Sequence, residues 1–174
     1  MNNNINGITA GLEFAQIGWV VPDIYTASKF LTNTLGIAGF PLPEHIRAQD
    51  LSMTYYGKVV EAEWLTTQTY NGGTFIELIQ PLSGESMFLD YLNKYPAGGT
   101  QHLAFRLPVG DFDRITGDLR KQGYELISEV DHPIARMMFF DTYQTMGVAT
   151  EIMGITPDGW TAIKKMQKTG SAKE

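Results

Sequence analysis

The hydrophobic pattern in the first half of the chain predicts a strand, a helix and then further strands. Residues 14–21 carry large apolar side chains and end at Pro22-Asp23, where Asp23 is a good N-cap for a helix. In that helix apolar residues recur every three or four positions, and Gly36 fits its C-cap. Alternation and a turn signal at 71–73 predict the strands that follow, at residues 51–56, 58–66 and 74–79.

The same order of elements restarts after a connecting segment. Residues 83–95 read as a linker with a short helix, which Pro96 and the glycines after it interrupt. A strand at 101–107 and a helix from Asp111 to Gly123 come next. The remaining predictions are strands at 124–130, 136–140 and 148–153, a terminal helix that starts at Pro157 and frays after Lys168, and a loose Asn- and Gly-rich arm at 1–11.

The two halves match position by position. QIGWVVP at 16–22 and HLAFRLP at 102–108 share one order of polar, apolar, small, aromatic, variable, apolar and proline residues. Each half also closes on a strand with one acid among apolar residues, Glu77 or Glu151. This repeat predicts an α+β fold of paired βαβββ modules, with a curved, partly open mixed sheet around a cavity and the helices outside. The expected division is a first module at 12–82, a linker at 83–98, a second module at 99–154 and a helical tail at 155–174.

Strand alternation places four polar residues on one face of this sheet. Gln16 and His102 point away from the apolar face that packs on the helices, and Glu77 and Glu151 do the same in the closing strands. Buried carboxylates are costly and repel each other, and a divalent cation resolves both problems. The pattern therefore predicts one metal ion per site, held by Gln16, Glu77, His102 and Glu151. Nitrogen and oxygen ligands suit Zn, Co, Ni, Mn or Fe, with open positions for a substrate.

Composition and charge exclude several classes of function. The net charge of −6 disfavours nucleic acid as a partner. The absence of cysteine excludes disulfides and thiolate metal sites. No apolar run approaches the roughly 20 residues of a membrane span, and the N-terminus lacks the basic and apolar regions of a signal peptide. A soluble cytoplasmic protein with no membrane partner is therefore expected.

Four stretches of the chain resemble the vicinal oxygen chelate superfamily, and within it the methylmalonyl-CoA epimerase-like branch. They are QIGWVVPDIYTASKFLTNTLGI, FIELIQPLSGES, GGTQHLAFRLPVGDFDRITGDLRKQG and FFDTYQTMGVATEIMG, which together span nearly all of residues 14–154. The resemblance implies paired modules around one metal, with ligands at the four positions named above. The epimerases typically carry His where this chain has Gln16. Glyoxalase I enzymes of some organisms use Gln, Glu, His and Glu in this order, so the resemblance supports metal binding more than the epimerase reaction.

The resemblance also implies a catalytic base and a mechanism. The epimerases place a Glu in a VVE context on the strand before the Glu77 strand, which Glu61 matches, and Glu63 lies two residues on, on the same face. One of the two is expected to point into the cavity; alternatively, both face solvent. A substrate with two nearby oxygens, such as a 2-acyl thioester acid or a hydroxy-carbonyl, would bind the metal, which stabilises an enolate. Glu61 or Glu63 would take a proton on one side, and Glu151 would deliver one on the other. These modules commonly pair, so a homodimer is expected.

Three functions compete at this point. The first is a metal-dependent epimerase, isomerase or lyase that acts next to a carbonyl. The second is a metal-free protein on the same fold that binds or sequesters a small molecule. Glu77, His102 and Glu151 argue for the enzyme, while Gln16 keeps the question open. A ring-cleaving dioxygenase is disfavoured, because iron in those relatives sits on two His and one Glu, and only His102 occupies a ligand position here.

Overall fold

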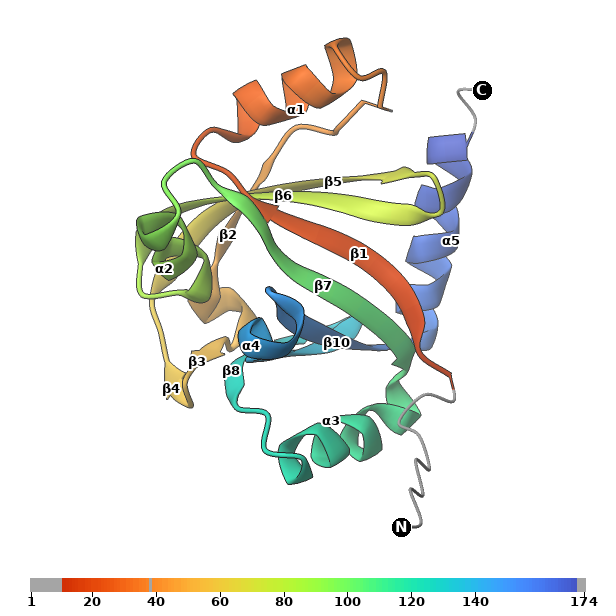
Figure 1. Ribbon diagram of the computed structural model, residues 1–174. Coiled ribbons are helices and arrows are strands. Elements are labelled where there is room, and N and C mark those ends of the chain that lie inside the picture. Colours follow the sequence, from red (N-terminus) through yellow and green to blue (C-terminus); the bar gives the residue numbers. More distant parts are fainter. Residues whose placement is uncertain (1–10, 38, 172–174) are drawn as a thin grey trace.

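Ten strands form one mixed, curled sheet with the helices around it (Figure 1). The computed structural model describes residues 11–37 and 39–171, so the expected arm lies outside the described residues except for Gly11. The strands are β1 Glu13–Val20, β2 Glu44–Arg47, β3 Thr54–Tyr55, β4 Lys58–Val59, β5 Ala62–Asn71, β6 Thr74–Gly84, β7 Gly99–Pro108, β8 Leu126–His132, β9 Ala135–Phe140 and β10 Ala149–Ile155. The helices are α1 Ile24–Asn33, α2 Met87–Lys94, α3 Phe112–Lys121, α4 Tyr143–Met146 and α5 Pro157–Ser171, with short 3-10 helices at Ala48–Leu51 and Val109–Asp111.

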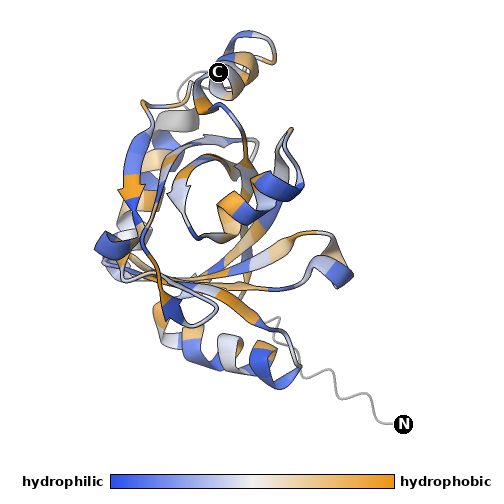
Figure 2. Cartoon of the chain, turned by 90° about the vertical axis from the view of Figure 1, so that its left-hand side faces the viewer, coloured by the Kyte–Doolittle hydropathy of each residue, from blue (hydrophilic) through white to orange (hydrophobic). Residues whose placement is uncertain are grey.

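The sheet has an approximate two-fold arrangement about its centre. Its strand order is β2-β5-β6-β1-β7-β10-β9-β8-β3-β4. β1 and β7 are antiparallel neighbours, and each has a parallel partner on its other side, β6 beside β1 and β10 beside β7. Seen from the side, the sheet curls so that its two halves face each other (Figure 2). The α+β fold of paired modules around a curved mixed sheet is therefore confirmed.

A short hairpin from the first half completes the edge of the second half. β3 and β4 precede β5 in the sequence, but β3 pairs with β8 at the opposite edge of the sheet. The backbone N–H of Tyr56 donates to the carbonyl of Ile127 at 2.7 Å. Ala48 and Met53, on the connection that leads to this hairpin, are buried in the interior of the curl. The two halves are thus joined at this edge as well as at the β1–β7 seam.

Three apolar clusters hold the layers together. On the outer face of the first half, Ile24 and Leu31 of α1 pack against Leu78 of β6. On the outer face of the second half, Phe112 and Ile115 of α3 occupy the matching place. The third cluster fills the inside of the curl; its buried members include Met53, Trp64, Met87, Phe88, Ile127, Val130 and Phe139. The inner face of the sheet is therefore lined by large apolar side chains on both sides of the seam.

Several predicted elements differ from those observed. Of the strand predicted at 51–56, only Thr54–Tyr55 is extended; Leu51 ends a 3-10 helix, and the residues between them form a turn. The strand predicted at 58–66 is broken into β4 and β5, and β5 continues to Asn71. An edge strand that the pattern did not predict, β2, directly follows Pro41 and Pro43. Helix α1 ends before Gly36, at Asn33, and α5 continues past Lys168 to Ser171. These differences fall at short edge strands and helix ends, where the periodic signal is weakest.

The terminal helix α5 lies along one end of the curled sheet in Figure 1. It connects to the first half through a contact between the Gln68 amide and the Met166 sulfur at 3.9 Å. The guanidinium of Arg106 lies 5.4 Å from the centre of the Trp160 ring. Within the described part of the chain, none of the helices combines the length and apolar character needed to cross a membrane.

Helix α2 provides a test of how this interior is held in place. Ser86 is 2% exposed and accepts a hydrogen bond from the N–H of Leu89 at 3.2 Å, which caps the helix that places Met87 and Phe88 in the interior cluster. We expect Ser86→Ala to lower the free energy of unfolding by about 1 kcal/mol, measured by chemical denaturation. Ser28→Ala serves as the control, because the half-buried Ser28 hydroxyl bonds within its own helix, to the carbonyl of Tyr25, and it should change the free energy of unfolding by less than about 0.5 kcal/mol. Equal effects of the two substitutions would contradict the capping role.

Candidate metal centre

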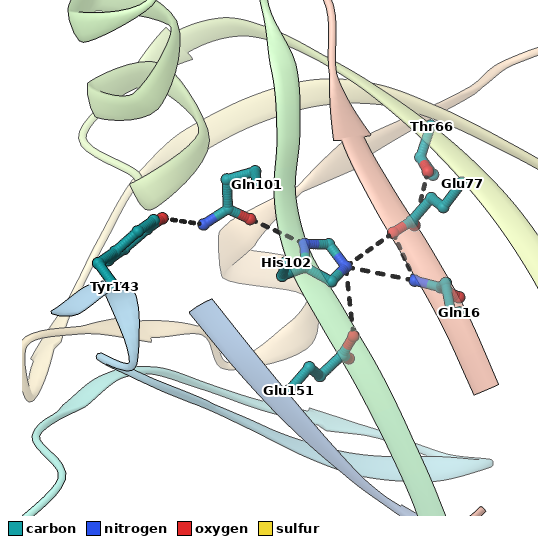
Figure 3. Close-up of polar contacts among 7 residues, drawn as sticks. All are labelled: Gln16, Thr66, Glu77, Gln101, His102, Tyr143 and Glu151. Carbon is teal, nitrogen blue, oxygen red and sulfur yellow. Dashed lines mark hydrogen bonds and ion pairs between the residues drawn. The ribbon is translucent and has the colours of Figure 1, made fainter. Parts of the chain in front are cut away.

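The four polar residues singled out from the sequence meet at the seam between the two halves (Figure 3). Gln16 comes from β1, Glu77 from β6, His102 from β7 and Glu151 from β10. Their strands are consecutive neighbours in the sheet, in the order β6-β1-β7-β10. Each half of the chain therefore contributes two of the four side chains. Their predicted convergence on the inner face is confirmed; their role as ligands stays a prediction.

Small residues separate these side chains along the sheet. Gly18 pairs with Glu77 on one side and with His102 on the other. Ala104 holds the matching position between the other two polar residues. The approach is close at Gly18, where an added Cβ atom would lie 1.9 Å from Cε1 of His102. The imidazole ring thus lies directly over Gly18, and any larger residue would displace it.

His102 is the centre of the cluster. Its Nε2 atom lies 3.4 Å from Oε2 of Glu151, 3.5 Å from Oε2 of Glu77 and 3.4 Å from Nε2 of Gln16. The Gln16 amide donates to Oε2 of Glu77 at 2.7 Å, and the hydroxyl of Thr66 donates to Oε1 of Glu77 at 2.9 Å. His102 is 1% exposed and Glu151 is 2% exposed. Two carboxylates and an imidazole are therefore held together with almost no solvent around two of them.

The burial of these groups changes their acidity. Burial raises the pKa of Glu151 to about 7; the charge of His102 lowers that pKa and the charge of Glu77 raises it. Burial lowers the pKa of His102, but its hydrogen bond to Glu77 and the charges of Glu151 and Glu77 outweigh burial, so this pKa lies above its usual value. Among the described residues, Oε2 of Glu151 is the buried side-chain atom that has no hydrogen-bond partner. A buried carboxylate oxygen without a partner is costly and needs a cation or a donor.

The donor set fits a divalent metal ion, although the side chains now bond to one another. Donor atoms about 2.1 Å from one metal lie about 3.4 Å apart in a tetrahedral arrangement, close to the separations around Nε2 of His102. Within residues 11–37 and 39–171, no group of three or more His, Cys, Asp or Glu side chains stands ready to hold an ion. The Gln16 amide donates directly to Glu77, at an oxygen that a metal ion would take. Turning the Gln16 amide over would present its oxygen instead of its nitrogen.

The second ring nitrogen of His102 is bonded on the side away from the carboxylates. Nδ1 lies 2.8 Å from Oε1 of Gln101, and Nε2 of Gln101 donates to the hydroxyl of Tyr143 at 2.8 Å. The alternation of faces does not predict a role for Gln101, because neighbours in a regular strand point to opposite faces. The structure thus adds Gln101 and Tyr143 to the surroundings of the site (Figure 3).

Aromatic residues form the apolar wall beside the imidazole. The Phe139 ring lies 5.3 Å from the His102 ring in an edge-on arrangement, and the Phe88 ring lies 6.5 Å away. Met137 and Phe139 belong to the interior cluster, whereas Met138 and Phe140 pack against α3 on the outer face. Such a wall excludes water and strengthens electrostatic interactions at the site.

The two candidate bases, Glu61 and Glu63, do not join the cluster. Glu61 is exposed. Oε2 of Glu63 lies 2.9 Å from Nε2 of His45, which belongs to the edge strand β2. Their neighbours Ala62 and Trp64 are the residues that point into the interior. The expectation that one of the two acids points into the cavity is therefore wrong in this structure. The cause is that Val59 is exposed and Val60 is buried, so the VVE stretch lies at a break between strands and not in a regular one.

A different acid, Glu44, shares a cavity with Glu77. The cavity has a volume of about 590 Å³ and lies between segment 39–44, β5 and α5. Glu44 is the strand partner of Thr66, so the two side chains share the face on which Thr66 reaches Glu77. The rest of the lining is largely apolar or uncharged; it includes Phe40, Pro41, Leu42, Gln68, Tyr70, Phe75 and Met166. Sequence reasoning missed Glu44 because its Pro-flanked stretch gave no strand signal.

The curled sheet of paired modules, with its polar cluster at the seam, has the fold of the vicinal oxygen chelate proteins. A family model described as the glyoxalase/bleomycin resistance protein/dioxygenase superfamily matches residues 15–140. That match covers well over half of the chain, and the chain belongs to this superfamily.

Individual relatives are methylmalonyl-CoA epimerases. The chain is 30% identical over 117 residues to the human mitochondrial enzyme, a match that covers 66% of this chain and 56% of the human protein. The structure of the Mycobacterium tuberculosis epimerase superposes with a TM-score of 0.56 at 23% identity, covering 90% of this chain and 95% of that one. A Streptomyces coelicolor epimerase in complex with 2-nitronate-propionyl-CoA gives a TM-score of 0.57 at 19% identity, covering 84% and 96%. These structural matches support the fold, and the chain spans little more than half of the human relative.

The close approach at Gly18 leads to a test of the site's geometry. We expect Gly18→Ala to displace the His102 ring and to lower the free energy of unfolding by about 1–3 kcal/mol, as overpacking does. The shift should be visible as changed ring signals of His102 in NMR spectra. Gly117→Ala is the matched control, because an added Cβ at this α3 position meets nothing within 4 Å. It should stabilise the protein by up to about 1 kcal/mol; equal behaviour of the two variants would contradict the packing argument.

Proposed function

We propose that the protein is a metal-dependent epimerase or isomerase that moves a proton on a carbon next to a carbonyl. The observation that carries the proposal is the buried cluster of His102, Glu77, Glu151 and Gln16, in which Oε2 of Glu151 makes no hydrogen bond and lies 3.4 Å from Nε2 of His102. The names of the relatives support epimerisation in particular. A lyase that begins with the same proton abstraction is the related alternative.

One divalent ion, of Zn, Co, Ni, Mn or Fe, would be held by Gln16, Glu77, His102 and Glu151. Bound there, it supplies the positive charge that stabilises an enolate. The protein's own part is to orient the donors and to keep water out. Thr66 fixes one oxygen of Glu77, and Phe139 closes the space beside the His102 ring. A nearby cation would also lower the raised pKa of Glu151.

Epimerisation requires proton transfer on both sides of a carbon, and two acids are candidates for this role. Glu151 lies within the cluster, and Glu44 lines the cavity that reaches Glu77 from the β2–β5 side. We assign the proton exchange to Glu151 on one side and to Glu44 on the other. Glu61 and Glu63 remain the sequence-based candidates, and the geometry favours Glu44 over both because only Glu44 of the three lines this cavity.

The cavity favours a substrate with an apolar or uncharged body and two nearby oxygens. Its walls come from segment 39–44, β5 and Met166 of α5, and they meet the cluster at Glu77. The relatives include an epimerase bound to an acyl-CoA analogue. We therefore propose a 2-acyl thioester acid as the first substrate class to examine, and a hydroxy-carbonyl compound as the second. The homodimer expected from the resemblance stays a prediction.

A metal-free binding protein is the second candidate function. The observation that favours it is the 2.7 Å bond between Gln16 and Glu77, which satisfies both groups without an ion. Such a protein would use the same cavity to hold a small molecule without chemistry. Metal analysis separates the two functions.

We expect the purified protein to carry about one first-row divalent metal per chain, as a single four-ligand site requires. Plasma mass spectrometry on protein prepared without a metal-binding tag would measure it. The His102→Ala, Glu151→Ala double variant should lose the metal. His45→Ala is the matched control, because this histidine is exposed on β2 and pairs with Glu63. If no metal binds even after addition of Zn, Co, Ni or Mn, the metal-free binding protein is the better description.

The assignment of the acids is tested by proton exchange from D₂O into a 2-acyl thioester acid, followed by NMR. We expect Glu44→Gln to lower the exchange rate by about 10²-fold or more, the usual contribution of an acid–base group, with metal content unchanged. Glu61→Gln and Glu63→Gln should each retain exchange, and Glu125→Gln on the exposed surface is the control. If Glu61→Gln or Glu63→Gln abolishes exchange and Glu44→Gln does not, the base lies where the sequence alone suggested.

A further inference from the structure

Two neighbouring residues of one strand, Gln101 and His102, are both fully buried and bonded to each other. Gln101 is 0% exposed and His102 is 1% exposed. Consecutive residues of a regular strand point to opposite faces and do not make such a contact. The pairing of β1 with β7 explains it: Gly18 pairs with His102 and Trp19 pairs with Thr100, so Gln101 is an extra residue without a partner on β1. This β-bulge re-aims the Gln101 side chain toward the imidazole.

The opposite half of the seam contains a bulge at the matching place. Phe14 pairs with Phe105 and Gln16 pairs with Ala104, so Ala15 is the extra residue there. In both halves the extra residue directly precedes a member of the polar cluster. Before His102 the extra residue is Gln101, whose amide can hydrogen-bond to the imidazole. Before Gln16 the extra residue is Ala15, which has no hydrogen-bonding side chain. An amide has no alternative tautomer, whereas a histidine does.

We propose that Gln101, held by Tyr143, is a positioning residue that keeps a proton on Nδ1 of His102 and leaves Nε2 free to bind the metal. The proposal rests on the metal site of the proposed function and adds the element that prepares it. Oε1 of Gln101 accepts from Nδ1 at 2.8 Å, and its amide nitrogen donates to the Tyr143 hydroxyl at 2.8 Å. The oxygen and the nitrogen of the Gln101 amide are therefore both hydrogen-bonded. Gln101 and Tyr143 lie on the side of the imidazole ring away from the two carboxylates (Figure 3).

The need for such a partner follows from the carboxylates on the other side of the ring. Oε2 of Glu77 and Oε2 of Glu151 both lie within 3.5 Å of Nε2. A neutral imidazole beside two acceptors would place its proton on Nε2 and donate it to them, which blocks metal binding. An acceptor fixed at Nδ1 opposes this tautomer. Tyr143 is carried by α4, so a segment outside the four ligand-bearing strands contributes to the state of the ring.

The proposal is tested by Gln101→Leu, which removes both hydrogen bonds, and Gln101→Glu, which retains an acceptor for Nδ1. Tyr143→Phe removes only the hydrogen bond between Tyr143 and Gln101. It replaces Gln101→Leu as the test variant if Gln101→Leu fails to fold. Tyr91→Phe is the matched control: its hydroxyl donates to the backbone of Thr100 at 3.0 Å, next to the bulge but away from His102.

The first measurement is the tautomer of His102 in the metal-free protein. Long-range ¹H–¹⁵N correlations on histidine-labelled protein at alkaline pH report which ring nitrogen carries the proton. We expect Nδ1 in the wild type, in Gln101→Glu and in Tyr91→Phe, and a shift toward Nε2 in Gln101→Leu. Tyr143→Phe should shift in the same direction by a smaller amount. A wild type with the proton on Nε2 would overturn the proposal.

The second measurement is the dissociation constant for Zn²⁺ or Co²⁺, from competition with a chelator. Gln101→Leu should weaken binding by about 10–100-fold, the usual effect of losing a partner of a metal-bound histidine. Gln101→Glu should bind within a few-fold of the wild type. Equal losses in Gln101→Leu and Gln101→Glu would reduce Gln101 to a packing role. If the wild type binds no metal, the metal site of the proposed function fails, and the ring spectra still decide whether Gln101 sets the tautomer.

Discussion

The structure depends on burying two carboxylates and an imidazole in the middle of a sheet. A charged group out of water is tolerated only when partners compensate it. The strands at the seam are arranged to provide this: Gly18 makes room for the His102 ring, and Ala104 occupies the matching gap. The aromatic wall of Phe88 and Phe139 excludes water from the same place. The raised pKa of Glu151 records that the compensation is incomplete without a further partner.

This constraint also explains why the two halves are joined so closely. Each half supplies two members of the cluster, and Nε2 of His102 from the second half lies 3.5 Å from Oε2 of Glu77 in the first half. The β3–β4 hairpin of the first half closes the far edge of the second, and Met53 on its approach is buried inside the curl. Long-range pairings of this kind hold the seam from both sides, which fixes the distances between side chains that are 61 to 86 residues apart.

The sequence predicted those features that follow from periodicity. Alternation placed Gln16, Glu77, His102 and Glu151 on one face, because each lies in a long strand with a regular apolar partner face. It failed where strands are short or irregular. The VVE stretch ending at Glu61 spans a break between β4 and β5, and Glu44 lies on a four-residue edge strand. Gln101 was missed because a bulge depends on the register with a distant strand, which no local pattern encodes.

The asymmetry of the first ligand position fits the same physical logic. The Gln16 amide carries a donor and an acceptor at nearly equivalent points, so it can hydrogen-bond to Glu77 or present an oxygen to a cation. It needs no orienting neighbour, and Ala15 provides none. His102 can present Nε2 to a cation only if its proton is kept on Nδ1. Oε1 of Gln101 lies 2.8 Å from Nδ1, where it can accept that proton in a hydrogen bond. Three of the four side chains are thus satisfied with or without an ion. Oε2 of Glu151 is, among the described residues, the buried side-chain atom that makes no hydrogen bond, although Nε2 of His102 lies 3.4 Å from it.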